Sequence, residues 1–126
     1  MAAAADDTPG RLAAYVIITV ATIVANAWAA GADLAQPKWL LANMDEVGVR
    51  RSRLLPLAVL KAAGAAGLVL GLLGVRLLAI AAAIGLVLFF TGALATHVRA
   101  RVFHNIAVPG AYFVLAAASA ALAIAR

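Results

Sequence analysis

The feature that most constrains the fold is the run from Leu54 to Arg101, in which two long apolar segments are separated only by Gly74 to Arg76. Each segment has about the 20 residues that an α-helix needs to cross the hydrocarbon core of a bilayer. Because the connection is so short, the two helices must reverse direction and form an antiparallel hairpin. Lys61 is the lysine inside the first of these segments.

Two further apolar segments lie on either side of this hairpin. The four expected spans cover about residues 12–34, 54–74, 76–98 and 105–124. With 126 residues, 67% of them hydrophobic and 12% charged, and a mean hydropathy of +1.07, the chain has more apolar surface than a soluble domain of this size can bury. We therefore expect an all-α fold, a transmembrane antiparallel four-helix bundle formed as one domain by residues 1–126.

The segment between the first two spans is polar and begins with Gln36-Pro37, which breaks the helix. In residues 38–48 the apolar side chains recur near helical spacing and the charged side chains lie opposite them, as in a short amphipathic helix at the membrane interface. Trp39 is expected to lie among the headgroups, and Gly48 is expected to end the helix.

Composition also excludes several classes of function. The chain has no cysteine, which rules out disulfides, thiol catalysis and thiolate metal sites, and no metal site is predicted. The net charge of +5 comes from basic residues that lie between apolar segments and are not interleaved with exposed aromatics. We therefore expect membrane lipids as partners, and no nucleic acid.

The distribution of these basic residues predicts the orientation in the membrane. Four spans place both termini on one side. That side carries Arg11, Arg76 and Arg126, and the opposite side carries Lys38, Arg50, Arg51, Arg53, Arg99 and Arg101. Because the cytoplasmic side of a membrane protein has the excess of basic residues, we expect a multi-pass plasma (inner) membrane protein with both termini outside the cytoplasm.

The polar residues of the first span are regularly spaced. Thr19, Thr22, Asn26 and Asp33 are separated by 3, 4 and 7 residues, which places them on one face of a helix. We expect this face to point into the bundle. The simpler interpretation of Thr19 and Thr22 is that their hydroxyl groups donate hydrogen bonds to the backbone of their own helix. Asn26 is harder to explain in this way, because an amide has more hydrogen-bonding groups than a neighbouring turn satisfies.

The candidate ligand-binding residues are Asn26, Asp33, Lys61, Thr96 and His97, because all five fall in the predicted cytoplasmic half of the bundle. Asn26 and Lys61 are nearly level, and the other three lie closer to the surface. A lysine at mid-bilayer costs about 2.5–3.5 kcal/mol. An ion pair between Asp33 and Lys61, or a hydrogen bond between Asn26 and Lys61, would explain why the span tolerates it. In the alternative interpretation, Lys61 only extends its ammonium to the membrane surface.

Glycines recur at intervals of three, four and seven along the second and third spans. The predicted helix-packing residues are Gly64, Gly67, Gly71, Gly85 and Gly92. Small residues at such spacing allow helices to approach closely in lipid, where association depends on van der Waals contact. The same glycines leave room for a second copy of the chain.

The end of the third span resembles a known family. The run Ala93-Leu94-Ala95-Thr96-His97-Val98-Arg99, together with the glycine-rich second span, is similar to the DoxX-like family of small four-helix membrane proteins. The likeness extends from about Ala25 to the C-terminus. It implies that some relatives are membrane subunits of quinone-linked sulfur oxidation or oxidative-stress assemblies, whereas most have no assigned reaction.

Two functions follow from these observations. We favour a non-catalytic subunit or assembly factor of a membrane-associated complex, such as a redox or quinone-linked one, with a protein partner or a second copy of the chain. The alternative is a pocket protein whose polar residues bind the polar end of a quinone or lipid, with proton transfer at His97 if it is catalytic. Haem between His97 and His104 is a weaker variant, because no aromatic-lined pocket accompanies them. No cofactor is predicted, and the sequence leaves open whether the protein is an enzyme.

Overall fold

The structure, a computed structural model, describes residues 8–126. In this part of the chain every regular element is helical: α2 (Thr8–Ala35), α3 (Lys38–Glu46), the 3₁₀ turn η1 (Arg51–Arg53), α4 (Leu54–Leu72), α5 (Arg76–Ala100) and α6 (Ala107–Ala125). Four segments are long and apolar enough to cross a membrane: Pro9–Ala35, Arg51–Leu72, Arg76–Ala100 and Ala107–Ala125. The predicted all-α bundle of four long helices, with a short helix between the first two, is therefore confirmed.

The helix ends coincide with backbone that leaves the right-handed helical region. Positive φ angles occur at Gln36 (52°), Gly48 (76°), Gly74 (119°) and Arg101 (58°). Glycine adopts such angles without a Cβ clash, which explains why the chain turns at Gly48 after α3 and at Gly74 between α4 and α5. Pro37 then stands immediately before α3, where its missing N–H is not needed.

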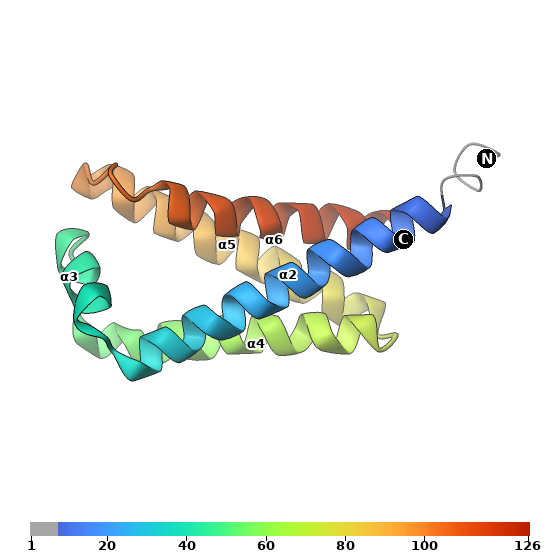
Figure 1. The fold of residues 1–126 in the computed structure, drawn as a ribbon, viewed down its shortest axis with the longest axis horizontal. Coiled ribbons are helices and arrows are strands. Elements are labelled where there is room, and N and C mark those ends of the chain that lie inside the picture. Colours follow the sequence, from blue (N-terminus) through green and yellow to red (C-terminus); the bar gives the residue numbers. More distant parts are fainter. Residues whose placement is uncertain (1–7) are drawn as a thin grey trace.

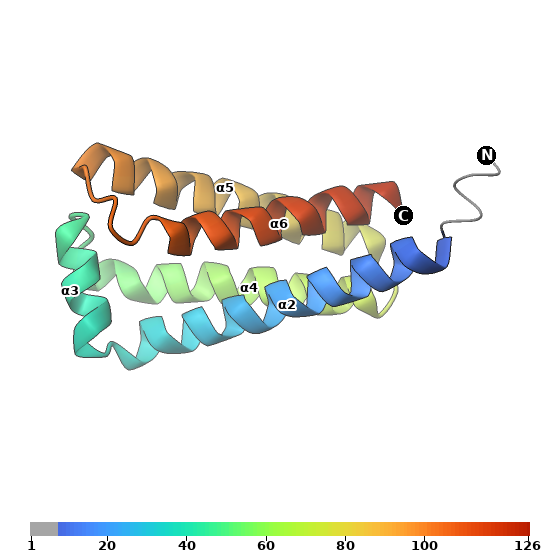
Figure 2. The same ribbon diagram turned by 45° about the horizontal axis from the view of Figure 1, so that its top comes forward.

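The four long helices form a bundle that is narrow at one end and wide at the other (Figure 1, Figure 2). Around the bundle α2 packs against α4 and α6, and α5 packs against the same two helices. Toward α3 the helices diverge as two pairs, α2 with α4 and α5 with α6. We call this end the wide end. The start of α2, the turn between α4 and α5, and the C-terminus lie at the opposite, narrow end.

Small side chains and one arginine hold the narrow end together. Tyr15, Ala79 and Ala123 form a buried cluster of residues from α2, α5 and α6. Arg76 donates hydrogen bonds to the carbonyl oxygens of Ala123 (3.3 Å) and Ile124 (2.8 Å), which are among the last carbonyls of α6. Because a helix leaves its last four carbonyls without partners, Arg76 caps α6 and ties it to the start of α5.

Helices α4 and α5 pack tightly along three of the predicted glycines. A Cβ added at Gly64 would lie 2.6 Å from the side chain of Leu86, and one at Gly67 would lie 2.6 Å from the Cβ of Ala82. At Gly71 an added Cβ would collide with Ala79. Only glycine allows this approach, in agreement with the packing expected of small residues in lipid.

The two glycines predicted on α5 behave differently. A Cβ added at Gly85 or Gly92 would meet nothing within 4 Å, and both residues are exposed. Within the described chain, therefore, the packing interpretation fits the three glycines of α4 and does not fit Gly85 and Gly92. Spacing alone could not separate the two groups, because it does not fix which face of α5 is turned toward α4.

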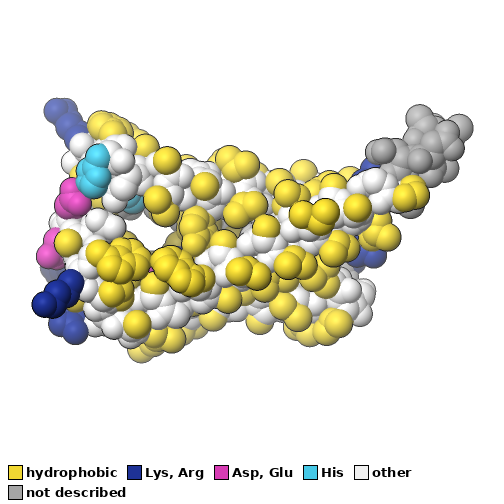
Figure 3. Space-filling model, in the orientation of Figure 1, with side chains coloured by type: hydrophobic (Ala, Val, Ile, Leu, Met, Phe, Trp, Pro, Cys, Tyr) yellow, Lys and Arg dark blue, Asp and Glu magenta, His cyan; other side chains and the backbone are white. Residues whose placement is uncertain are grey.

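The interior of the bundle combines a mainly apolar core with a polar stripe along α2, and the outside is apolar. Thr19, Thr22 and Asn26 are 0% exposed and Asp33 is 2% exposed, so the prediction that this face of α2 points into the bundle is confirmed. Large apolar side chains cover the outer surface along the helices, whereas the acidic residues and histidines of the face in view gather at the wide end (Figure 3). This distribution is that of a protein whose solvent is lipid.

Candidate functional site

The charged residues inside the bundle form an ion pair. The Nζ of Lys61 on α4 lies 2.9 Å from Oδ2 of Asp33 on α2, and their side chains are 12% and 2% exposed. The ammonium also lies 5.5 Å from the centroid of the Phe89 ring on α5, within the range of a cation–π contact. The predicted Asp33–Lys61 ion pair is thus present, and it connects three of the four long helices.

Asn26 lies on the same face of α2, seven residues before Asp33, and makes no hydrogen bond to Lys61. Its Nδ2 donates a hydrogen bond to the carbonyl oxygen of Thr22 (2.9 Å). Its Oδ1 is buried and has no hydrogen-bond partner among the described residues, and the same is true of Oγ1 of Thr19. The structure does not contain the alternative, a hydrogen bond between Asn26 and Lys61: the ammonium is bonded to Asp33, and the Nδ2 of Asn26 is bonded to its own helix.

Thr96 and His97 also bond to their own helix. Oγ1 of Thr96 donates to the carbonyl oxygen of Gly92 (2.8 Å), and Nδ1 of His97 lies 2.9 Å from the carbonyl oxygen of Ala93. Of the five predicted site residues, the structure thus joins only Asp33 and Lys61 directly. Their shared depth was inferred from distance along each helix, which does not determine the direction of a side chain.

The contact between α2 and α6 contains polar bonds that sequence reasoning did not find. Oγ1 of Thr22 lies 2.8 Å from Oγ of Ser119, and the hydroxyl of Tyr112 donates to the carbonyl oxygen of Ala25 (3.0 Å). The spacing of seven residues between Tyr112 and Ser119 placed both on one face of α6, but the sequence did not show that this face meets α2. Bonds of this kind hold helices together where no water competes.

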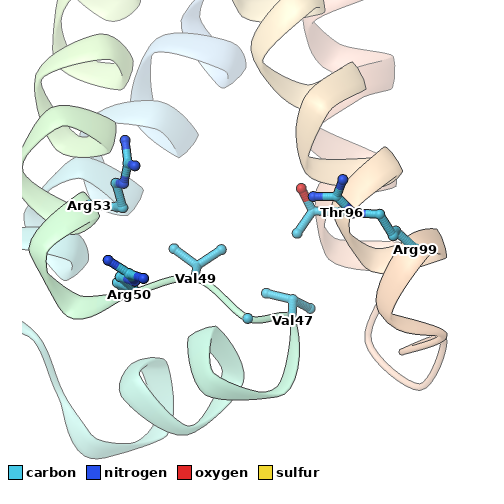
Figure 4. A pocket seen from close by; sticks show the side chains of 7 residues that line it. Val47, Val49, Arg50, Arg53, Thr96 and Arg99 are labelled. Carbon is cyan, nitrogen blue, oxygen red and sulfur yellow. The ribbon is translucent and has the colours of Figure 1, made fainter.

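A hollow with three arginines opens where the helix pairs diverge. It has a volume of about 370 Å³ and is lined by Val47, Gly48, Val49, Arg50, Arg53, Thr96 and Arg99. We call it the basic hollow. Arg53 faces Thr96 and Arg99 across it, and the loop between Val47 and Val49 lies beneath (Figure 4). It combines residues that the sequence assigned separately, the basic cluster after α3 and the Thr-His-Val-Arg end of α5.

Contacts made by α3 and the connecting segments close the wide end. Nε2 of His104, in the segment between α5 and α6, lies 2.8 Å from Oε2 of Glu46 at the end of α3. The Trp28 and Trp39 rings stack with centroids 6.1 Å apart, which joins α3 to α2. Arg51 donates to Oε1 of Gln36. These contacts hold α3 across the end of the bundle, between the two helix pairs, as Figure 2 shows.

The two histidines have different partners. His97 contacts its own helix, whereas His104 contacts Glu46 on α3. Within residues 8–126, no group of three or more His, Asp or Glu side chains is arranged to hold a metal ion. The histidine arrangement therefore gives no geometric support to the haem variant.

The fold and these contacts define the class of protein. Four apolar helices of membrane-spanning length surround polar bonds and an ion pair, as in an integral, multi-pass membrane protein. The model of the DoxX-like family matches residues 17–119, and the chain belongs to this family. Searches among curated proteins and among solved structures find no match to it.

Proposed function

We propose that this DoxX-like protein binds the polar end of an amphipathic molecule, a lipid or a quinone, in the basic hollow. The observation that carries the proposal is the hollow itself, which lies between Arg53 at the start of α4 and Thr96 near the end of α5. Its volume of about 370 Å³ falls within the range of about 300–1,000 Å³ that is usual for small-molecule sites. Although the sequence favoured a subunit role, it gave no indication that the helix pairs diverge here.

The interior polar residues support binding rather than chemistry. Lys61 is paired with Asp33, and Thr96 and His97 are bonded to carbonyl oxygens of their own helix. These bonds hold the side chains in place. Lys61 lies eight residues beyond Arg53 along α4, or roughly 12 Å at 1.5 Å per residue, so the ion pair stands about two turns deeper than the hollow. It fixes α2 against α4 beneath the point where the bundle widens.

Native mass spectrometry of the protein released in a mild uncharged detergent, with organic extraction of the same sample, tests this proposal. We expect one lipid or quinone per chain. Thr96→Trp should fill the hollow and displace this molecule. Thr91→Trp is the matched control, since Thr91 is also on α5 and donates to the carbonyl oxygen four residues before it, yet does not line the hollow. An empty wild-type protein, or equal retention by both variants, would contradict the proposal.

A non-catalytic subunit or assembly factor is the second candidate, favoured by Gly85 and Gly92. Both glycines are exposed and a Cβ at either would meet nothing within 4 Å, so that a helix of a partner or of a second copy can approach α5 closely at these two positions. Gly92→Leu should then release a polypeptide that copurifies with the wild-type protein, or convert a dimer into a monomer. Unchanged copurification and mass would argue against this role.

A further inference from the structure

We propose that the basic hollow is a site for an anionic phosphate group, carried by a lipid headgroup or free in solution. This inference rests on the proposed function and names the chemistry of the ligand. The lining contains three guanidinium groups, of Arg50, Arg53 and Arg99, and no carboxylate. Arginine presents a rigid fork of N–H donors that matches phosphate oxygens, and three forks around one space suit an anion with several oxygens.

The three arginines have no anionic partner among residues 8–126. The ion pairs among the described residues join Lys61 to Asp33 and His104 to Glu46. The neighbouring Arg51 bonds instead to Gln36. Within residues 8–126, no hydrogen bond or ion pair satisfies the guanidinium groups that line the hollow. Since like charges facing one another repel, a bound anion would remove a repulsion that no carboxylate among the described residues compensates.

The backbone adds positive potential at the same place. The 3₁₀ turn η1 runs directly into α4, with the N–H of Leu54 bonded to the carbonyl oxygen of Arg51, so the helical N-terminus stands at Arg50, whose side chain makes no capping bond. The N-terminus of a helix carries a partial positive charge that attracts anions. The side chains of Arg50, Arg53 and Arg99 and the helix terminus at Arg50 therefore favour the same sign of ligand.

The surroundings distinguish an anionic headgroup from a zwitterionic one. A choline headgroup brings a cation with its phosphate, and the lining residues offer no carboxylate to receive it. An anionic phospholipid brings only the phosphate charge. Val47 and Val49 border the hollow and provide apolar contact beside it. We therefore expect anionic phospholipid or inorganic phosphate to bind, and phosphatidylcholine to be excluded.

The test uses the full chain in nanodiscs of phosphatidylcholine alone and of phosphatidylcholine mixed with an equal share of phosphatidylglycerol. Native mass spectrometry measures the lipid retained after release, and thermal unfolding in uncharged detergent measures the response to inorganic phosphate. The test variant is Arg53→Gln with Arg99→Gln. Lys38→Gln is the matched control, because it removes an exposed basic residue at the same end of the bundle that does not line the hollow.

If the inference is correct, phosphatidylglycerol stays with the wild-type protein and with Lys38→Gln. The double variant should lose about fivefold in retention for each arginine removed, from about 1 kcal/mol per basic residue near an anionic surface. The variant with Arg53→Lys and Arg99→Lys keeps the charge, should bind better than the glutamine variant, and shows that loss of binding is not loss of folding. A response to inorganic phosphate without lipid retention would identify the free anion as the ligand.

Three results would overturn the inference. If a neutral molecule such as a quinone is retained, is displaced by Thr96→Trp and is unaffected by the arginine variants, the phosphate assignment is wrong and the proposed binding function stands. If neither lipid, phosphate nor any other small molecule binds, both fall. Equal loss of phosphatidylglycerol in Lys38→Gln and in the double variant would show general surface charge in place of a site.

Discussion

Replacing Asp33 by asparagine keeps the shape of the side chain but removes the counter-charge of Lys61. The average worth of a polar pair inside a membrane protein, about 0.6 kcal/mol, gives a lower limit for the loss of stability. The cost of an isolated lysine at mid-span, about 2.5–3.5 kcal/mol, gives an upper limit. Lys61 is already 12% exposed and has a long stem that can turn toward the surface. We therefore expect Asp33→Asn to destabilise the protein by about 2 kcal/mol.

Removing the cation of the pair should reduce stability more than removing the anion. Lys61→Met removes the cation and leaves the carboxylate of Asp33, which is 2% exposed and too short to reach water. Breaking a buried ion pair from one side typically costs about 3–5 kcal/mol, and we expect about 3 kcal/mol here. The variant with both Asp33→Asn and Lys61→Met contains neither charge and should lose no more than about 2 kcal/mol of stability. The effects of the two single changes are then non-additive by about 3 kcal/mol.

These values can be measured by unfolding the protein with sodium dodecyl sulfate in mixed micelles. The chain has two tryptophans, Trp28 and Trp39, whose stacked rings report on the wide end through their fluorescence, while circular dichroism reports on the helices. Asp45→Asn, an exposed carboxylate of α3, is the control and should change stability by less than about 0.5 kcal/mol. The reasoning would be refuted if Asp33→Asn and Lys61→Met each changed stability by less than about 0.5 kcal/mol and their effects were additive in the variant with both changes. The ion pair would then contribute nothing measurable to the fold.

Three further predictions follow from contacts elsewhere in the bundle. Gly67→Ala should cost about 1–3 kcal/mol in the same unfolding assay, because its Cβ would lie 2.6 Å from that of Ala82, whereas Gly85→Ala meets nothing within 4 Å and should not destabilise. Thr22→Val and Ser119→Ala should show a coupling energy of about 0.6 kcal/mol in a double-mutant cycle, and strict additivity would mean that their 2.8 Å contact carries no energy. A topology reporter fused after the C-terminus should be active outside the cytoplasm and one inserted near residue 50 inside it; the opposite pattern would overturn the charge-based orientation.

The sequence was sufficient where a pattern depends on one helix at a time. The spacing of Thr19, Thr22, Asn26 and Asp33 identified the buried face of α2, because a polar stripe in a lipid-facing helix has no other favourable place. The need of a buried ammonium for a counter-charge made Asp33 one of two candidate partners of Lys61, although depth along the helices favoured Asn26. The short helix after Pro37 could be predicted because a breaker, an amphipathic stretch and a glycine follow one another.

It was insufficient where the answer depends on helix rotation and tilt. Lipid is as apolar as a helix surface, so hydrophobicity does not indicate which apolar face meets another helix. Gly67 and Gly85 therefore look alike in sequence, although one contacts α5 and the other is exposed. Similarly, the depth of Thr96 and His97 could be estimated, but not that both bond to their own helix and that only Thr96 lines the basic hollow.

The unequal ends of the bundle suggest how a ligand and stability are coupled. The narrow end is held by direct packing and by the capping bonds of Arg76, and the middle by the ion pair and the α2–α6 hydrogen bonds. At the wide end the pairs diverge, Arg53 and Arg99 line opposite sides of the basic hollow, and we expect their like charges to repel. A ligand that bridges them binds the folded bundle and not the separated helices, so it stabilises the fold in proportion to the logarithm of its concentration over its Kd. In a membrane rich in such a ligand the site stays occupied, whereas extraction dilutes the ligand and exposes the repulsion. Salt, which screens that repulsion, should therefore stabilise the extracted protein more than the membrane-embedded one.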